Sequence, residues 1–288
     1  MGKFLVYCGK LLLIGVIILF ILDFCYTHSY YMAVRSKQSW LKSSLLDKEW
    51  DYVFIGSSRC IHHVDPKTIQ SINGKKGVNL GYSASGPVEK YLMVREVIDE
   101  LKVKTIYIEV GLKYNSEYPD NLAIVSWLPF SRERKIPRYL SEGNIVLPYA
   151  YNFPFYRYIK NSPKIGYREV ILNYIQKNAK FIDHQGYLPI KEKIISDTTH
   201  YQIVISGRKS RYYNLIDSLC SKANINVVYL TSPIYNTSIN TDLLEKNFSN
   251  YYDYSNLFEE DRYFRDRNHL NDAGASKFST VLANEIFE

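Results

Sequence analysis

Cysteine is scarce in this sequence. The 288 residues contain four cysteines, and Cys8 and Cys25 lie in an apolar N-terminal stretch. Cys60 and Cys220 alone cannot form the disulfide framework of a chain this long, so they predict either one disulfide or a pair of buried free thiols. Polar low-complexity runs are also absent and 46% of the residues are hydrophobic, which excludes a largely disordered chain.

A concentrated basic stripe is missing as well. The 36 Lys and Arg residues exceed the 29 Asp and Glu residues by seven, and they are spread along the chain. Nucleic-acid-binding proteins usually gather these residues on one face, so we expect no nucleic-acid partner. No metal site is expected either: His62 and His63 are adjacent, so their rings diverge on a helix or strand, and no cluster of Cys, Asp or Glu completes a ligand set.

Charge is nearly absent from Phe4–Leu22, where Lys10 is the only charged residue. About 20 apolar residues span the hydrocarbon core of a membrane, so we predict a transmembrane anchor over residues 1–26, with Asp23 at the interface. A cleaved signal peptide is the alternative, but Asp23–Tyr26 provides no small-residue cleavage site. Basic residues lie on both sides of the span, so the excess of Lys and Arg that usually marks the cytoplasmic side does not decide its orientation.

The rest of the sequence predicts an α/β protein. We expect a juxtamembrane stalk over residues 27–50, followed by one domain over 51–288. Within this domain, short apolar runs predict strands at 51–55, 78–81, 105–110 and 226–231, and apolar periodicity predicts helices at 87–101, 207–220 and 272–287. The segment at about 112–200 is rich in Tyr, Pro and Arg and has no regular apolar pattern. It predicts a partly helical insertion that shapes a substrate site or packs near the membrane.

Alternating strands and helices indicate a parallel sheet covered on both faces. In such sheets ligands bind beyond the carboxyl ends of the strands. The first predicted strand runs into Gly56-Ser57-Ser58-Arg59, which places a serine at this edge. Ser58 is either a nucleophile, with its amide as an oxyanion donor, or part of an ordinary capped turn. Arg59 either orients a substrate or pairs with a carboxylate at the rim of the sheet.

A second motif, Asp266-x-x-His269, lies just before the last predicted helix. A serine nucleophile needs a base within hydrogen-bonding distance, and the base needs a third group that fixes its tautomer. Asp266 and His269 in one loop can supply both. The pair of motifs is more specific than either one alone.

Together these motifs resemble the SGNH/GDSL hydrolase superfamily, in its membrane-anchored branch with GSSR in place of GDS. The resemblance covers residues 51–111 and 225–287. It implies a three-layer α/β/α sandwich with a short parallel, flavodoxin-like sheet. By the same resemblance Ser58 is the nucleophile, Asp266 and His269 complete the triad, and Gly81 of VNLGYSASGP contributes an oxyanion-hole amide beside that of Ser58.

The sequence departs from the family in its third block, where Glu109-Val110-Gly111 replaces the usual Gly-x-Asn. The departure weakens a generic esterase assignment. The resemblance implies an O-acyltransferase on a cell-envelope polysaccharide, without a cofactor, often served by a multi-pass membrane acyltransferase partner. An esterase or deacetylase that uses water is the alternative, and a silent glycan-binding protein is the third. If the protein is an acyltransferase or an esterase of this kind, we expect the domain after the anchor to lie outside the cytoplasmic membrane.

Overall fold

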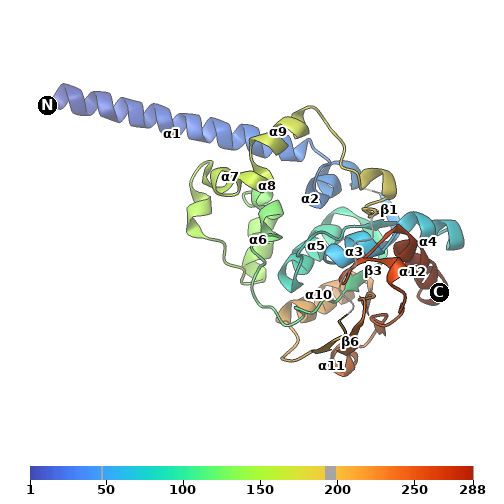
Figure 1. The fold of residues 1–288 in the computed structure, drawn as a ribbon. Helices are drawn as coiled ribbons and strands as arrows, with labels where there is room; N and C mark the ends of the chain where they lie inside the picture. The colour runs from blue at the N-terminus through green and yellow to red at the C-terminus, as the bar shows by residue number, and fades with distance from the viewer. Residues whose placement is uncertain (47, 192–198, 288) are drawn as a thin grey trace. The chain divides into compact units, whose positions relative to one another are not determined.

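The computed structural model describes residues 1–46, 48–191 and 199–287. They form two compact units (Figure 1). The first unit combines Met1–Ser44 with Val125–Asn178, and the second combines Leu45–Ile124 with Ala179–Glu288. These divisions differ from the predicted domains, because part of the predicted insertion belongs with the N-terminal helix.

The second unit is built on a five-stranded parallel sheet in the order β2-β1-β3-β5-β7. The strands are β1 (Glu49–Ile55), β2 (Gly77–Asn79), β3 (Lys102–Glu109), β5 (Asn226–Thr231) and β7 (Tyr251–Asp253). Val53 pairs with Val78 of β2, and Ile108 joins Ile55 of β1 to Tyr229 of β5. The predicted mixed α/β class with a parallel sheet is therefore confirmed.

Helices pack on both faces of this sheet because its strands bury side chains alternately on each side. Helices α5 (Pro87–Glu100) and α10 (Arg211–Lys222) contact each other and the central strands. Helix α12 (Asp272–Glu285) contacts both α3 (Ser58–His63) and α4 (Pro66–Asn73), and the three share an apolar cluster with the strand residues Phe54, Tyr107 and Leu230.

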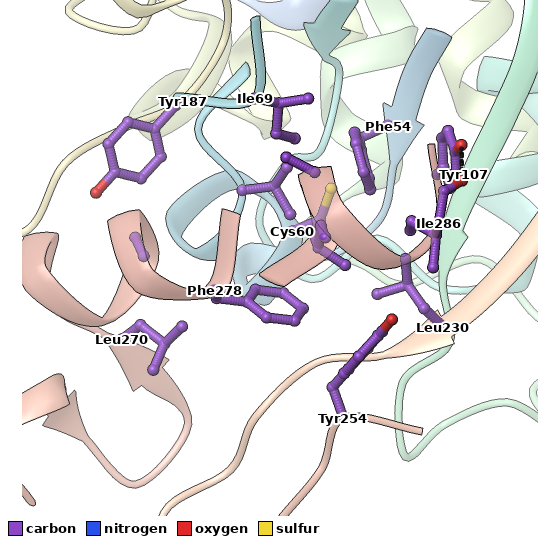
Figure 2. Close-up of a cluster of buried hydrophobic side chains, with 14 of the residues drawn as sticks. Phe54, Cys60, Ile69, Tyr107, Tyr187, Leu230, Tyr254, Leu270, Phe278 and Ile286 are labelled. Atoms are coloured by element: carbon purple, nitrogen blue, oxygen red, sulfur yellow. Dashed lines mark hydrogen bonds between the residues drawn. The ribbon is translucent and has the colours of Figure 1, made fainter. Parts of the chain in front are cut away.

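Figure 2 shows this cluster, which includes Cys60 of α3 and Leu270, the residue that precedes Asn271 at the start of α12. Both side chains are completely buried. Cys60 and Cys220 are both buried free thiols, which decides between the two predicted alternatives.

One predicted helix start differs from the observed one. The helix predicted from Gly207 begins at Arg211, because Gly207 has φ +90° and Ser210 caps the helix by accepting a bond from the Tyr212 amide. Helix α12 begins at Asp272, as predicted, and Asn271 caps it, since its side chain accepts a hydrogen bond from the Gly274 amide.

The remaining elements of the second unit are short. Strands β4 (Tyr201–Val204) and β6 (Thr237–Asn240) form a parallel pair, and β8 (Phe264–Asp266) pairs antiparallel with β9 (His269–Leu270). Helix α11 (Asp242–Asn247) and the single turns Ile182–His184 and Asp261–Tyr263 complete it.

The first unit contains one long helix, α1 (Gly2–Tyr31), which is long and apolar enough to cross a membrane. Its most apolar 18-residue window has a mean hydropathy of 2.7 and is wholly unburied. After α1, the predicted stalk continues as α2 (Lys37–Trp40) and a π-helical turn (Leu41–Leu45), and all four residues of α2 are buried. The other elements are α6 (Lys135–Glu142), α7 (Tyr156–Lys160), α8 (Ser162–Ile165), α9 (Tyr167–Tyr174) and 3-10 turns at Ile124–Phe130 and Tyr149–Asn152.

Candidate active site

The turn that carries Ser58 joins β1 to α3 at the carboxyl edge of the sheet. Gly56 lies at the tightest point: a Cβ atom there would come within 2.5 Å of Cys60 Cβ and 2.7 Å of Glu109 Cβ. Ser57 caps α3 by accepting a 3.3 Å bond from the Arg59 amide, and Ser58 is the first helical residue. A capped turn therefore follows β1, and Ser57 rather than Ser58 is its cap.

Substitution of Gly56 by alanine tests this packing. The added methyl group meets Cβ atoms held by the core and by Glu109, so either the turn or β3 has to shift. Overpacking of this kind costs about 1–3 kcal/mol. We expect the Gly56→Ala chain to unfold at lower denaturant concentration. A variant at Gly74, where a Cβ meets nothing within 4 Å but φ is +74°, separates crowding from backbone strain.

Ser58, His269 and Asp266 form one hydrogen-bonded chain. Ser58 Oγ lies 2.9 Å from His269 Nε2, and His269 Nδ1 lies 2.9 and 3.0 Å from the two carboxylate oxygens of Asp266. Because a carboxylate only accepts, the Nδ1–H donates to Asp266 and Nε2 is left to accept the Ser58 hydroxyl proton. This is the tautomer that a general base needs.

The β8–β9 hairpin holds Asp266 and His269 in place. Asp266 Oδ1 also accepts the backbone amides of Asn268 at 2.9 Å and His269 at 3.1 Å. The residue after His269 is Leu270, which lies in the same apolar cluster as Cys60, two residues after Ser58. One core cluster therefore fixes both the nucleophile helix and the base hairpin.

Ser58 and His269 line an open pocket of about 220 Å³, and Asp266 lies behind His269. It is lined by Ser57–Arg59, Ala84–Gly86, Gly111–Lys113, Asn268 and His269. The side chains of His269 and Asp266 are 25% and 42% exposed. A small ester or thioester group can therefore reach Ser58 and His269 from solvent.

Behind the nucleophile turn lies the buried carboxylate of Glu109, at the end of β3. Its Oε2 accepts both the amide of Ser57, at 3.0 Å, and the Ser57 hydroxyl, at 2.9 Å. Its Oε1 accepts Arg59 Nη2 at 2.6 Å, and Lys90 Nζ lies 3.8 Å from Oε2. Glu109 thus ties the turn to the neighbouring strand and is surrounded by two cations.

The charges in this cluster shift one another's pKa values. Burial alone would raise the pKa of Glu109, but the charges of Arg59 and Lys90 and the bonds from Ser57 outweigh it and hold the pKa at about 2. Burial lowers the pKa of Lys90, although Glu109 opposes that shift. Glu109 is consequently an ionised acceptor at neutral pH.

Arg59 forms an ion pair with Glu109, which is the second of the two roles considered for it from the sequence. Its side chain also lines the pocket, and its buried Nη1 has no hydrogen-bond partner within the described parts of the chain. The predicted contact with substrate is compatible with this position.

Gly81 is placed differently from the prediction. It is not among the residues that line the pocket, and its amide donates to Asn79 Oδ1 at 2.9 Å. A Cβ at Gly81 would lie 2.8 Å from both Cβ and Sγ of Cys60, so the glycine permits close packing on α3. The structure therefore does not bring Gly81 together with Ser58 as a free donor.

The adjacent histidines His62 and His63 of α3 lie beside the base hairpin. His63 is fully buried and accepts the Leu270 amide at 3.0 Å, and burial lowers its pKa well below the usual value. Its ring and that of His62 lie edge-on to His269, with centroids 6.4 and 5.5 Å away. No metal-binding group of three or more His, Cys, Asp or Glu side chains occurs in residues 1–46, 48–191 and 199–287.

Three residues in or behind the site were not predicted to belong to it: Glu109, Lys90 and Ala84. Glu109 could have been recognised because it ends a buried strand. The turn after the first strand carries Arg59, which can pair with such a carboxylate. Ala84 lines the pocket with φ +63°, a backbone conformation that no sequence pattern around it revealed.

No protein-family model and no curated protein matches this chain. The site is therefore interpreted from its own geometry.

Proposed function

We propose that this protein is a membrane-anchored SGNH-type serine acyl-transfer enzyme. The hydrogen-bonded chain Ser58–His269–Asp266 at the carboxyl edge of a parallel sheet is the observation that carries this proposal. Numbered along the chain, the five strands of the sheet follow the order 2-1-3-4-5, which is that of flavodoxin-like sheets. That order supports the SGNH assignment.

The reaction follows from the atoms in place. Ser58 Oγ attacks the acyl carbonyl carbon as its proton passes to His269 Nε2, and Asp266 stabilises the imidazolium. Collapse of the tetrahedral intermediate breaks the bond to the leaving group, which takes the proton from His269. An acceptor hydroxyl then loses its proton to His269 and attacks the acyl carbon. The bond between this carbon and Ser58 Oγ breaks, and Oγ takes the proton back from His269.

The oxyanion needs amide donors. The Ser58 amide lies at the start of α3 and has no hydrogen-bond acceptor in the described residues, so it is one candidate. We propose the amide of Ala84 as the second, in place of Gly81. Ala84 belongs to the turn closed by the 3.3 Å bond from the Ser85 amide to the Tyr82 carbonyl, and this turn lines the pocket.

We propose a cell-envelope polysaccharide hydroxyl as the acceptor and an extracytoplasmic position for the body. The apolar helix α1 supports a membrane location. A multi-pass membrane acyltransferase would deliver the acyl group to Ser58. The exposure of His269 and Asp266 favours a second candidate, an ester hydrolase, because water reaches the same acyl-serine.

An acyl-partition assay tests the proposal. The full chain in lipid nanodiscs receives p-nitrophenyl acetate together with an oligosaccharide, and mass spectrometry measures acetylated sugar while absorbance measures total turnover. Acetylated sugar in excess over the Ser58→Ala chain supports transfer. Turnover without acetylated sugar supports hydrolysis. Equal turnover by both chains contradicts an enzymatic function and favours glycan binding.

A further inference from the structure

Large apolar side chains are unusually exposed in residues 146–175, which we call the collar. Nine exposed large hydrophobic residues lie there, whereas the described part of the whole second unit has eight. Tyr149, Phe153 and Ile175 are 77%, 59% and 65% exposed. Soluble surfaces rarely gather such residues, so the collar faces something other than bulk water.

Helix α9 shows the pattern most clearly. Tyr167, Ile171 and Tyr174 recur at intervals of four and three residues and are 67%, 55% and 49% exposed, so they form one outward stripe. Val170 and Asn173 are buried. This helix has its apolar stripe on the outside, opposite to the usual arrangement in a soluble protein.

The collar is attached to α1 where the apolar span ends (Figure 1). Tyr174 Oη donates to the Cys25 carbonyl at 2.9 Å, and Asn173 Nδ2 lies 3.4 Å from Ser29 Oγ. At 1.5 Å per residue, Cys25 lies about 5 Å beyond Leu22 along the helix, which is headgroup depth if Leu22 ends the span.

A second set of contacts holds α7 and the loop before it. Asp23 accepts Arg157 at 2.7 Å, Arg132 at 3.1 Å and the Phe155 amide at 2.6 Å. The Phe155 ring stands edge-on to Tyr26, with centroids 4.8 Å apart.

These two sets of contacts lie on different sides of α1. At about 100° per residue, Cys25 and Ser29 lie about 160° and about 120° around α1 from Asp23, whereas Tyr26 lies about 60° from it. The collar therefore contacts α1 on two sides. The contacts on both sides fix its position along the helix axis.

The sequence that contains the collar carries a net positive charge. Residues 125–178 contain nine Lys and Arg but three Asp and Glu, a net charge of +6. Lys160, Lys164 and Arg168 are exposed among the apolar residues of the collar. Aromatic side chains with interspersed basic ones are characteristic of surfaces that lie in the interface of an anionic bilayer.

We propose that the collar inserts its exposed aromatic and aliphatic side chains into the headgroup region of an anionic phospholipid membrane. The inference rests on the proposed anchorage of α1 and goes beyond the proposed catalysis. Because the collar binds α1 at the end of its span, the two elements together form one membrane-embedded unit.

Site-specific quenching in lipid vesicles tests the proposal with the full chain. In a Cys8→Ser, Cys25→Ser background, bimane is attached to Phe153→Cys or Ile171→Cys in the collar. Ile14→Cys in α1 serves as the anchor reference, and Ile72→Cys, 44% exposed in the second unit, is the matched control. Vesicles contain phosphatidylglycerol and phosphatidylcholine with a nitroxide either at the headgroup or in mid-chain.

We expect headgroup nitroxide to quench Phe153 and Ile171 labels at least about threefold more than the Ile72 label, and mid-chain nitroxide to quench Ile14 most. Replacing phosphatidylglycerol by phosphatidylcholine should weaken collar quenching and leave Ile14 unchanged. If Ile14 is quenched while collar labels behave like Ile72, the collar proposal is overturned and the anchor stands. If Ile14 is also unquenched, the anchorage itself fails, and the collar proposal with it.

Discussion

Replacement of His269 by alanine is expected to lower kcat for hydrolysis of p-nitrophenyl acetate by about 10⁴-fold, to near the level of the Ser58→Ala chain. His269 Nε2 is 2.9 Å from Ser58 Oγ, so without it the hydroxyl keeps its proton and is a poor nucleophile. The double variant should be no slower than either single one, because the two residues act as a unit. Stopped-flow absorbance measures all three chains.

The matched control is His62→Asn. The His62 ring is the half-buried neighbour of His269, and its Nδ1 lies 2.7 Å from the Leu188 carbonyl oxygen. We expect kcat within about threefold of the unaltered chain, because no proton-transfer contact is removed. A loss at His62 as large as that at His269 would show that the assay reports folding of the hairpin rather than base catalysis.

Replacement of Glu109 by glutamine is expected to produce the second large effect. The amide keeps the shape but leaves Arg59 and Lys90 buried without their counter-charge, which typically costs about 3–5 kcal/mol of folding stability. It also weakens the bonds that hold Ser57, and displacement of a nucleophile by about 1 Å can cost about 10² in rate. We expect a lower kcat with little change in KM, since Glu109 positions Ser58 through the turn.

Two variants separate positioning from general instability. Glu109→Asp keeps the charge and should recover part of both stability and kcat. Glu49→Gln, at the other end of the sheet, removes an exposed ion pair with Lys102 whose side chains are 78% and 74% exposed, and should change neither. A stable, fully active Glu109→Gln chain would contradict the positioning role.

The same residue predicts a pH dependence with a defined sign. The pKa of Glu109 is about 2 in the folded chain, below its ordinary value of 4.5. A lowered pKa gives stability that is complete above the unfolded value and is lost as the pH falls through the folded one. The stability difference between the unaltered chain and Glu109→Gln should therefore be constant above about pH 5 and shrink as the pH falls from 4.5 towards 2. Chemical denaturation across this range measures it.

The sequence predicted the fold class well because local signals and tertiary packing agree there. The strand Asn226–Thr231 has the predicted bounds, and α5 ends one residue before the predicted limit, since Pro87 and the Leu101 C-cap define its ends. Ser58, Asp266 and His269 were predictable as a set because each follows or precedes an identifiable element of the sheet. We expected the three side chains to lie together because their segments meet at the carboxyl edge of the sheet. In the structure Ser58 and Asp266 each lie within hydrogen-bonding distance of His269.

The rest depended on contacts that no local pattern encodes. Asn79 lies two residues before Gly81, yet only the fold shows that its side chain takes the Gly81 amide. Glu109 and Ser57 are 52 residues apart and meet through the pairing of β1 with β3. The bond between Asp23 and Arg157, 134 residues apart, likewise joins the predicted insertion to α1.

A fluorophosphonate probe tests whether Ser58 is an activated nucleophile. The full chain in nanodiscs is treated with the probe, and the adduct is mapped by mass spectrometry. Ser85→Ala is the matched control, because Ser85 lines the same pocket. We predict an adduct on Ser58 that persists in the Ser85→Ala chain and disappears in the His269→Ala chain. Labelling at Ser85, or labelling of Ser58 that is unaffected by loss of His269, would contradict the account.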